Sequence, residues 1–268
     1  MINKTIMLVL FSLFSSSFAF ANDVRSQLLQ AADNEASGEY VRQRFLQWAK
    51  VPFNLNDTKK KALIIGDSHA QDFFNSVLES NSLTQYQIRT RYIPTGCQPF
   101  IGKEAELFIL PKDQALCETA DNLHLAKAQI AQADVVILVA NWKEWSAIQL
   151  PHTIKALQLN TQQKLIIIGR KSFGKISIRR YLRLPSKKLS SLRNKPDAVQ
   201  MKINTLMKNS LSKDIFVDLQ DIICGSQTTC PLFTEEAALI SFDGGHLTKE
   251  GAKYIGQQLF KNSILSRL

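Results

Sequence analysis

A serine stands where a short apolar run gives way to a helical pattern. Gly66-Asp67-Ser68 follows the apolar residues 62–65, and apolar residues then recur at helical spacing from position 70 onward. Where a strand turns into a helix, backbone N–H groups at the helix N-terminus point toward the group that a serine hydroxyl would attack. The position therefore indicates a nucleophile, and Ser68 is the candidate.

A serine hydroxyl is a weak nucleophile until a base takes its proton. The chain has four histidines, and His246 is the best placed because it lies in a Gly-rich stretch directly before the last expected helix. Asp243 precedes it by three residues, a spacing that lets the carboxylate fold back on the imidazole and fix its tautomer. We interpret Ser68, His246 and Asp243 as a catalytic triad. His69 adjoins Ser68, but successive side chains diverge, so we expect it to pack or to form local hydrogen bonds.

Acyl transfer also needs donors aimed at the developing oxyanion. The candidates are the backbone N–H groups of Ser68 and Gly96 and the side-chain amide of Asn141. We expect Trp142 to stack on a sugar ring of the substrate, with core packing as the alternative. The whole constellation also has a structural alternative, in which Ser68 only caps the following helix and Asp243 only caps a loop.

The elements that must position these residues alternate between apolar strands and helical segments. Strands are expected at 62–66, 86–93, 134–140, 164–169 and 215–219. Helices are expected at 27–50, 70–79, 116–131, 151–159, 198–211 and 248–260. This alternation predicts an α/β fold with a mainly parallel sheet covered by helices on both faces. In such sheets ligands bind at the carboxyl ends of the strands, which gathers the candidate residues at one edge.

The N-terminus has the features of a secretory signal peptide. Lys4 supplies the positive charge, residues 6–14 are apolar, and Ala19-Phe20-Ala21 is a small-x-small cleavage site. An uncleaved anchor is the alternative. We therefore expect a signal peptide at 1–21, a helical N-terminal extension at 22–59 and the main domain at 60–268, in a protein that is periplasmic or secreted.

All four cysteines lie in the expected mature chain: Cys97, Cys117, Cys224 and Cys230. An even count in an exported protein indicates disulfides, and four cysteines permit three pairings. Local spacing favours Cys97–Cys117 and Cys224–Cys230. Neither pair has the spacing typical of zinc sites, and we expect no metal and no cofactor.

Positive charge is concentrated in one segment of a chain whose formal net charge is +10, or +9 without Lys4. Residues 170–195 contain ten basic residues and no acidic one: Arg170, Lys171, Lys175, Arg179, Arg180, Arg183, Lys187, Lys188, Arg193 and Lys195. An exported protein meets anionic glycans and lipid headgroups rather than nucleic acid, so we expect this basic loop to contact anionic envelope components. A solvated loop without a partner is the alternative.

The motifs resemble those of a known superfamily. Gly66-Asp67-Ser68, Gly96, Asn141 and Asp243-x-x-His246 resemble the four blocks of the SGNH (GDSL-type) hydrolases. The resemblance covers roughly residues 60–262. It implies a flavodoxin-like, three-layer α/β/α fold, a Ser–His–Asp triad, and an oxyanion hole built from the serine, the glycine and the asparagine. Two blocks depart from the pattern, because block one reads Gly-Asp-Ser-His rather than Gly-Asp-Ser-Leu and block three reads Ala-Asn-Trp.

Within the superfamily, three longer motifs look like one group. Gly-Asp-Ser-His-Ala, Gly-Cys-x-Pro and Asp-x-x-His-Leu-Thr-x-x-Gly-Ala are similar to the periplasmic SGNH domain fused to membrane acyltransferases that O-acetylate bacterial surface polysaccharides. The resemblance implies an exported serine esterase or acyltransferase that acts on O-acyl, above all O-acetyl, groups of a cell-envelope glycan. It also implies a membrane acyltransferase as a candidate partner.

Two other functions stay open at this point. One is a non-catalytic glycan-binding or scaffolding protein of the same fold. The other is a lipase-like enzyme at the membrane, which the basic loop alone suggests.

Overall fold

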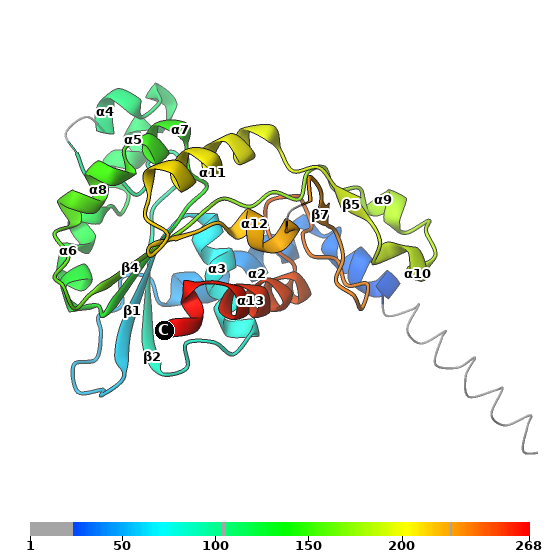
Figure 1. The fold of residues 1–268 in the computed structure, drawn as a ribbon, viewed down its shortest axis with the longest axis horizontal. Coiled ribbons are helices and arrows are strands. Elements are labelled where there is room, and N and C mark those ends of the chain that lie inside the picture. The colour runs from blue at the N-terminus through cyan, green and yellow to red at the C-terminus, as the bar shows by residue number, and fades with distance from the viewer. Residues whose placement is uncertain (1–23, 103–104, 226) are drawn as a thin grey trace, which may run out of the picture.

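A parallel sheet forms the centre of the protein. The computed structural model describes residues 24–102, 105–225 and 227–268, so the expected signal peptide lies outside the described residues. Five parallel strands form the sheet in the order β2-β1-β3-β4-β6, the strand order of flavodoxin-like folds (Figure 1). Their bounds are β1 Lys60–Gly66, β2 Tyr86–Tyr92, β3 Val135–Val139, β4 Lys164–Ile168 and β6 Phe216–Val217.

The register brings the carboxyl ends of the strands to one edge. Gly66 at the end of β1 pairs with Tyr92 of β2 on one side and with Val139 of β3 on the other. Val139 in turn pairs with Ile168 at the end of β4. The strand order reverses between β1 and β3, and ligands of open α/β sheets bind at such a switch point. Residues that follow β1 and β3 therefore meet there.

Helices cover both faces of the sheet because successive strand side chains point to opposite sides. On one face, Ala62 and Ile64 join a core with α2, α3, α12 and α13. On the other face, Leu63 and Ile65 join a core with α6, α7, α8 and α11. The bounds are α2 Asn34–Gln47, α3 Ser68–Glu79, α6 Leu123–Gln132, α7 Glu144–Ile148, α8 Leu150–Leu157, α11 Ala198–Ser210, α12 Leu219–Cys224 and α13 Lys249–Asn262. The three-layer α/β/α fold is thus confirmed.

The N-terminal region packs on the same core as the rest of the chain. The expected helix over 27–50 is two helices, residues 24–31 and α2, because Asp33 accepts hydrogen bonds from the N–H groups of Glu35 and Ala36 and starts a new helix. Leu28 and Phe45 from these helices lie in the core that also contains α3. The boundary expected at residue 60 therefore does not separate two cores.

A second expected helix is also divided. In place of one helix over 116–131 there are α5 (Pro111–Thr119) and α6, preceded by the short α4 (Ala105–Phe108). Asn122 begins α6 by accepting a hydrogen bond from the Leu125 N–H at 3.0 Å. The apolar spacing continues across this cap, which is why the sequence pattern did not reveal the break.

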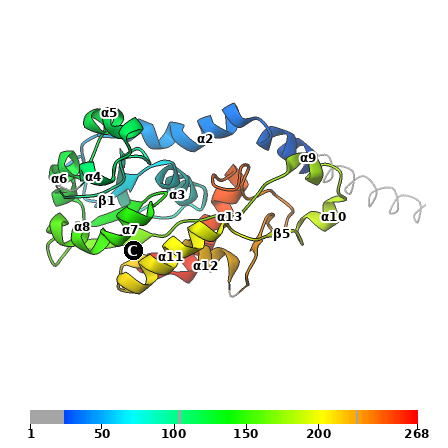
Figure 2. The ribbon, with the colours of Figure 1, turned by 90° about the horizontal axis from the view of Figure 1, so that it is seen from above.

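The basic segment is partly folded rather than a plain loop. It contains α9 (Ile178–Tyr181), α10 (Ser186–Leu189) and β5 (Arg193–Asn194), which pairs antiparallel with β7 (Cys230–Pro231). Figures 1 and 2 place α9 and α10 at the end of the molecule opposite α6 and α8. We call residues 175–195 the basic arm. Arg170 and Lys171, which precede it, are buried in the body of the protein, so the expected single run of exposed charge is wrong at those two positions.

Two disulfides join the cysteines in the pairing that local spacing favours. Cys97 and Cys117 connect the loop after β2 to α5, with sulfurs 2.07 Å apart. Cys224 and Cys230 connect the end of α12 to β7, with sulfurs 2.05 Å apart. The second disulfide thereby fixes the strand on which β5 of the basic arm rests.

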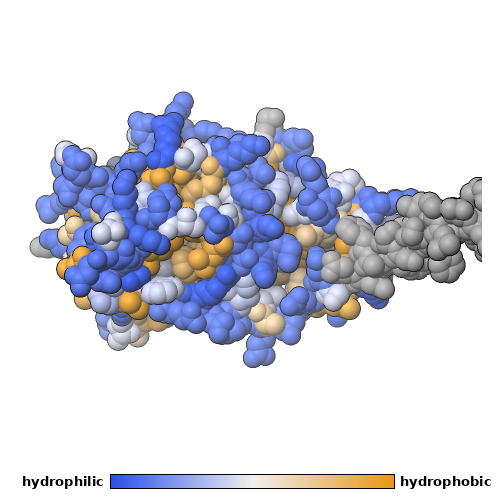
Figure 3. Space-filling model, turned by 90° about the horizontal axis from the view of Figure 1, so that it is seen from below, coloured by the Kyte–Doolittle hydropathy of each residue, from blue (hydrophilic) through white to orange (hydrophobic). Residues whose placement is uncertain are grey.

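The surface is mostly polar. Figure 3 shows a largely hydrophilic face on which apolar side chains gather in small patches. Among the described residues, no helix combines the length and the hydropathy needed to cross a membrane. The chain ends in α13 and a short 3-10 helix, Ile264–Arg267.

Candidate active site

Ser68 is the first residue of α3, and only Asp67 separates it from the end of β1. Asp67 caps the helix with a fully buried carboxylate that accepts a hydrogen bond from the His69 N–H at 2.9 Å. Ser68 itself is half-buried. A hydroxyl in this position lies beside the N–H groups of the first helical turn, where the helix dipole favours negative charge.

The Asp67 carboxylate connects three loops at the switch point. Besides the His69 N–H, it accepts hydrogen bonds from Thr95 Oγ1 at 2.8 Å and from the Asn141 N–H at 2.9 and 3.0 Å. Thr95 precedes Gly96 in the loop after β2, and Asn141 follows β3. Asp67 therefore joins all three expected oxyanion-hole segments, through two backbone N–H groups and one hydroxyl, a role that the sequence did not reveal. Burial raises the pKa of this carboxyl, against the hydrogen bonds that it accepts.

His246 and Asp243 form a directly bonded pair. His246 Nδ1 lies 2.7 Å from Asp243 Oδ2, and Asp243 Oδ1 accepts from the N–H groups of Gly245 and His246 at 2.8 and 2.7 Å. The bond to Asp243 raises the pKa of His246. Burial opposes ionisation of Asp243, but the hydrogen bonds from His246 and Gly245 prevail and lower its pKa to about 2. Because Nδ1 is used by the carboxylate, Nε2 is the nitrogen that can exchange a proton with a substrate or a nucleophile.

The His246 ring lies beside the residue next to Ser68. The rings of His69 and His246 meet edge to face, with centroids 6.2 Å apart. Both histidines line an open pocket of about 550 Å³, together with Asn141, Lys171 and Asp243. Burial lowers the pKa of His69 well below its ordinary value, which favours the neutral ring. The chain thus brings an early serine and a late Asp–His pair to one region of the sheet edge.

A buried ion pair connects the elements that carry Ser68 and His246. Lys171 Nζ lies 2.7 Å from Asp72 Oδ2, with 2 and 1% of the two side chains exposed. Asp72 Oδ1 accepts from the Leu247 N–H at 3.1 Å. Asp72 stands one turn after Ser68 in α3, and Leu247 follows His246, so the pair ties the serine helix to the histidine loop. In the sequence, Lys171 was one of many basic residues, and nothing distinguished it.

The remaining expected site residues are Trp142, Asn141 and Gly96. Trp142 is fully buried, and its indole N–H donates to the Ile168 carbonyl at 2.9 Å. The expectation that it stacks on substrate is therefore wrong, and the core-packing alternative holds. The side-chain oxygen of Asn141 is buried without a hydrogen-bond partner among the described residues. Gly96 is half-buried and lies against Asp113 of α5.

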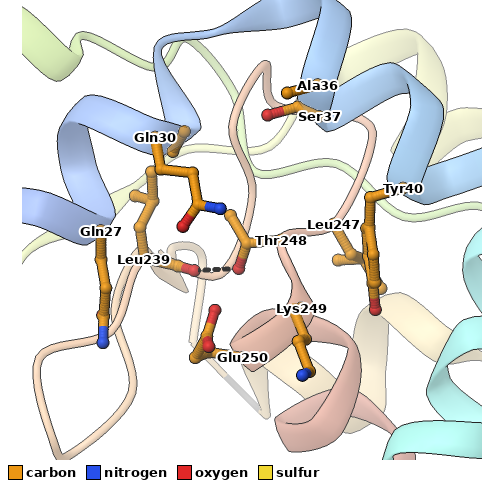
Figure 4. Close-up of a pocket in the computed structure, with 11 residues that line it drawn as sticks. Gln27, Gln30, Ala36, Ser37, Tyr40, Leu239, Leu247, Thr248, Lys249 and Glu250 are labelled. Carbon is orange, nitrogen blue, oxygen red and sulfur yellow. Dashed lines mark hydrogen bonds between the residues drawn. The ribbon is translucent and has the colours of Figure 1, made fainter.

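A smaller pocket lies between the N-terminal helices and residues 239–250. Tyr40 of α2, Leu239, Leu247 and Thr248 line it (Figure 4). Thr248 Oγ1 donates to the Leu239 carbonyl and accepts from the Gly251 N–H, which begins α13. The N-terminal helices therefore adjoin the segment that directly follows His246.

Comparison with known proteins agrees with this geometry. Residues 33–261 match the model of the family described as SGNH domain (fused to AT3 domains). The chain belongs to this family of SGNH domains. The match begins near the start of α2, so it includes this helix of the expected N-terminal extension.

Two solved structures align with the chain. The periplasmic domain of the lipopolysaccharide acetyltransferase of Salmonella ser. Paratyphi A aligns with a TM-score of 0.55 and 18% identity, over 88% of this chain and 99% of that one. The lipase Lip_vut3 from a goat rumen metagenome aligns with a TM-score of 0.36 and 10% identity, over 76% of this chain and 97% of that one. The first likeness shows a shared fold. No curated protein matches the chain in sequence.

Proposed function

We propose that this protein is an exported serine esterase or O-acyltransferase that acts on O-acyl groups, above all O-acetyl groups, of a cell-envelope glycan. One observation carries the proposal. The bonded Asp243–His246 pair packs against His69, the neighbour of Ser68, at the switch point of the sheet. Membership of the SGNH family supports hydrolase or acyltransferase chemistry in general.

In the first half of the proposed reaction, Ser68 Oγ attacks the carbonyl carbon of the acyl ester. His246 Nε2 takes the hydroxyl proton, and Asp243 stabilises the imidazolium that forms. The carbonyl oxygen becomes an oxyanion near the Ser68 N–H, the Gly96 N–H and the Asn141 amide. When the tetrahedral intermediate collapses, the ester C–O bond breaks and His246 returns the proton to the departing sugar oxygen. The products are an acyl-Ser68 enzyme and a free sugar hydroxyl.

In the second half Ser68 is the leaving group, and His246 again acts first as base and then as acid. A water molecule or an acceptor hydroxyl loses its proton to His246 and attacks the acyl carbon. The bond to Ser68 Oγ breaks, and His246 gives the proton to that oxygen. Water yields a carboxylic acid and the free enzyme, whereas a sugar hydroxyl yields a transferred acyl ester. The pocket that His246 lines is open to solvent, which is compatible with either acceptor.

The substrate, partner and compartment follow from what the family and the disulfides suggest. The family joins SGNH domains to AT3 domains, and one similar solved structure is the periplasmic domain of a lipopolysaccharide acetyltransferase. We therefore propose an acylated envelope glycan as substrate and a membrane acyltransferase as partner. The two disulfides favour an oxidising location, which agrees with a periplasmic or secreted protein.

An aryl-acetate assay tests the proposal. We expect the wild type to hydrolyse the ester and Ser68→Ala to lose roughly 10³-fold or more of kcat/KM. Ser266→Ala serves as the control, because this exposed serine lies in the C-terminal 3-10 helix. A folded wild type with the same rate as Ser68→Ala would instead favour the non-catalytic glycan-binding protein.

A further inference from the structure

Two lysines stand at the edge of the active-site pocket without a carboxylate partner. Lys175 and Lys195 line the pocket with His246, and both side chains are exposed. Among the residues that the structure describes, no carboxylate oxygen lies within ion-pair distance of either Nζ. Two cations that line one pocket without a carboxylate partner create a local positive potential that favours binding of an anion.

The backbone holds these two lysines in fixed relation to each other. Asn194 Nδ2 donates to the carbonyls of Phe173 and Lys175 at 3.1 and 2.7 Å. Gly174 has φ +65°, and a Cβ there would meet the Lys195 carbonyl oxygen at 2.3 Å. Only glycine permits this close approach, so Lys175 and Lys195 are anchored on two segments that touch.

The same segments are anchored to the His246 loop. The Phe173 N–H donates to the Gly244 carbonyl at 2.9 Å. Gly244 has φ +96°, and a Cβ there would lie 2.1 Å from the Gly174 carbonyl oxygen. The segment that carries Lys175 is therefore fixed against Gly244, which precedes His246 by two residues. Because both lysines line the same pocket as His246, their charges would contact the substrate itself.

Both carboxylates of the pocket already have other partners. Asp243 is bonded to His246, and Asp197 Oδ1 accepts from the N–H groups of Val199 and Gln200 at the start of α11. Asp197 is also fixed through its own N–H, which donates to Ser172 Oγ at 3.0 Å. Neither carboxylate forms an ion pair with the lysines.

The positive surface continues away from the pocket along the basic arm. Its remaining cations are exposed and form no ion pair with a described carboxylate: Arg179, Arg180, Arg183, Lys187, Lys188 and Arg193. Figure 2 shows α9, β5 and α10 extending from the body of the protein. Apolar residues of the arm are turned inward, with Tyr181 and Leu189 buried in the core cluster. A surface that presents cations and hides its apolar side chains fits a hydrated polyanion better than a lipid bilayer.

We propose that Lys175 and Lys195 form a subsite for an anionic group of the substrate, so that the acylated glycan is an acidic polymer whose chain continues along the basic arm. This inference rests on the proposed function for the acyl group, but the binding step does not depend on turnover. Lysine ammonium groups act as point charges and can bind either a carboxylate or a phosphate on the sugar.

Binding to a catalytically silent protein separates this inference from the proposed function. Ser68→Ala protein is titrated with an oligogalacturonate, which carries carboxylates, with a glycerol-phosphate oligomer, which carries phosphates, and with a neutral xylo-oligosaccharide. We expect at least one acidic oligomer to bind more tightly than the neutral one. We expect this preference to weaken when salt rises from about 20 to about 200 mM, because exposed charge pairs are screened.

The charge variants locate the subsite. Adding Lys175→Gln and Lys195→Gln should weaken binding of the acidic oligomer about tenfold, the effect of two partly exposed ion pairs, whereas Lys175→Arg with Lys195→Arg should retain it. Lys127→Gln with Lys155→Gln is the matched control, since both lysines are exposed on α6 and α8 at the opposite end of the molecule.

Phosphatidylglycerol vesicles are titrated in parallel as a lipid probe. Three results would overturn the inference: equal binding of acidic and neutral oligomers, an equal loss of binding affinity in the Lys127→Gln and Lys155→Gln control, or binding to the vesicles without binding to either acidic oligomer. An inactive wild type that still shows the charge-dependent binding would refute the proposed function and leave this subsite standing. Thermal unfolding of each variant verifies that it is folded.

Discussion

Replacing Asp243 with Asn removes one charge from the proposed triad and leaves the local fold in place. Asp243 Oδ1 accepts from the backbone N–H groups of Gly245 and His246, and an asparagine oxygen keeps both bonds. The other position faces His246 Nδ1 at 2.7 Å, where the amide presents an N–H donor in place of a carboxylate oxygen. The imidazole must then accept at Nδ1, so its proton moves to Nε2, the atom that has to act as base.

We expect Asp243→Asn to lower kcat strongly and the free energy of unfolding only slightly. A wrong tautomer and an unsupported imidazolium reduce kcat by roughly 10⁴-fold in such triads, equivalent to about 5 kcal/mol of transition-state stabilisation. The free energy of unfolding should fall by at most about 1 kcal/mol, because the Asp243 side chain is 40% exposed and both backbone bonds remain. Asp214→Asn, at an exposed carboxylate before β6, is the control and should leave both quantities unchanged.

The pH dependence gives a second readout. His246 must be neutral to take a proton, so kcat/KM should rise with pH through the pKa of His246, which the Asp243 carboxylate holds above its ordinary value of 6.5. Without that charge the imidazolium is less stable, and the inflection should move to lower pH. Stopped aryl-acetate assays across the pH range measure both effects. An Asp243→Asn enzyme with a wild-type rate and an unmoved inflection would refute the assignment of this pair.

Three further predictions concern the parts that hold the site. Lys171→Met should lower the free energy of urea unfolding by about 3–5 kcal/mol, because it leaves the Asp72 carboxylate buried and unpaired; a loss under about 1 kcal/mol would contradict the ion pair. Asn141→Ala should lower kcat about a hundredfold with little change in KM, and an unaltered kcat would remove Asn141 from the oxyanion hole. Cys97→Ser with Cys117→Ser removes a disulfide that joins residues with a sequence separation of 20, so the free energy of unfolding, measured by thermal melting, should fall by about 3 kcal/mol. A double variant as stable as the wild type would argue against this disulfide.

Much of the fold was visible in the sequence because long apolar strands leave an unambiguous pattern. The strand expected at 134–140 is β3 Val135–Val139, and the serine does begin a helix. Capping side chains were harder to recognise. Asp33 and Asn122 each divide a helix whose apolar spacing runs on across the cap, so periodicity alone predicted one helix in each place.

The site was predictable only where its parts lie close together in the chain. The three-residue spacing of Asp243 and His246 suggested their bond, and the bond is present. Contacts between distant residues left no such signal. Lys171 reaches Asp72 across 99 positions, and Trp142 turns into the core although it directly follows a site residue. These outcomes depend on how helices pack against the sheet, which residue spacing does not specify.

Labelling with a fluorophosphonate, followed by peptide mapping, tests the central claim most directly. We expect a single adduct on Ser68 of the folded wild type, formed far more slowly when His246→Gln removes the base. An adduct on another residue, or a folded protein whose Ser68 stays unlabelled, would contradict it.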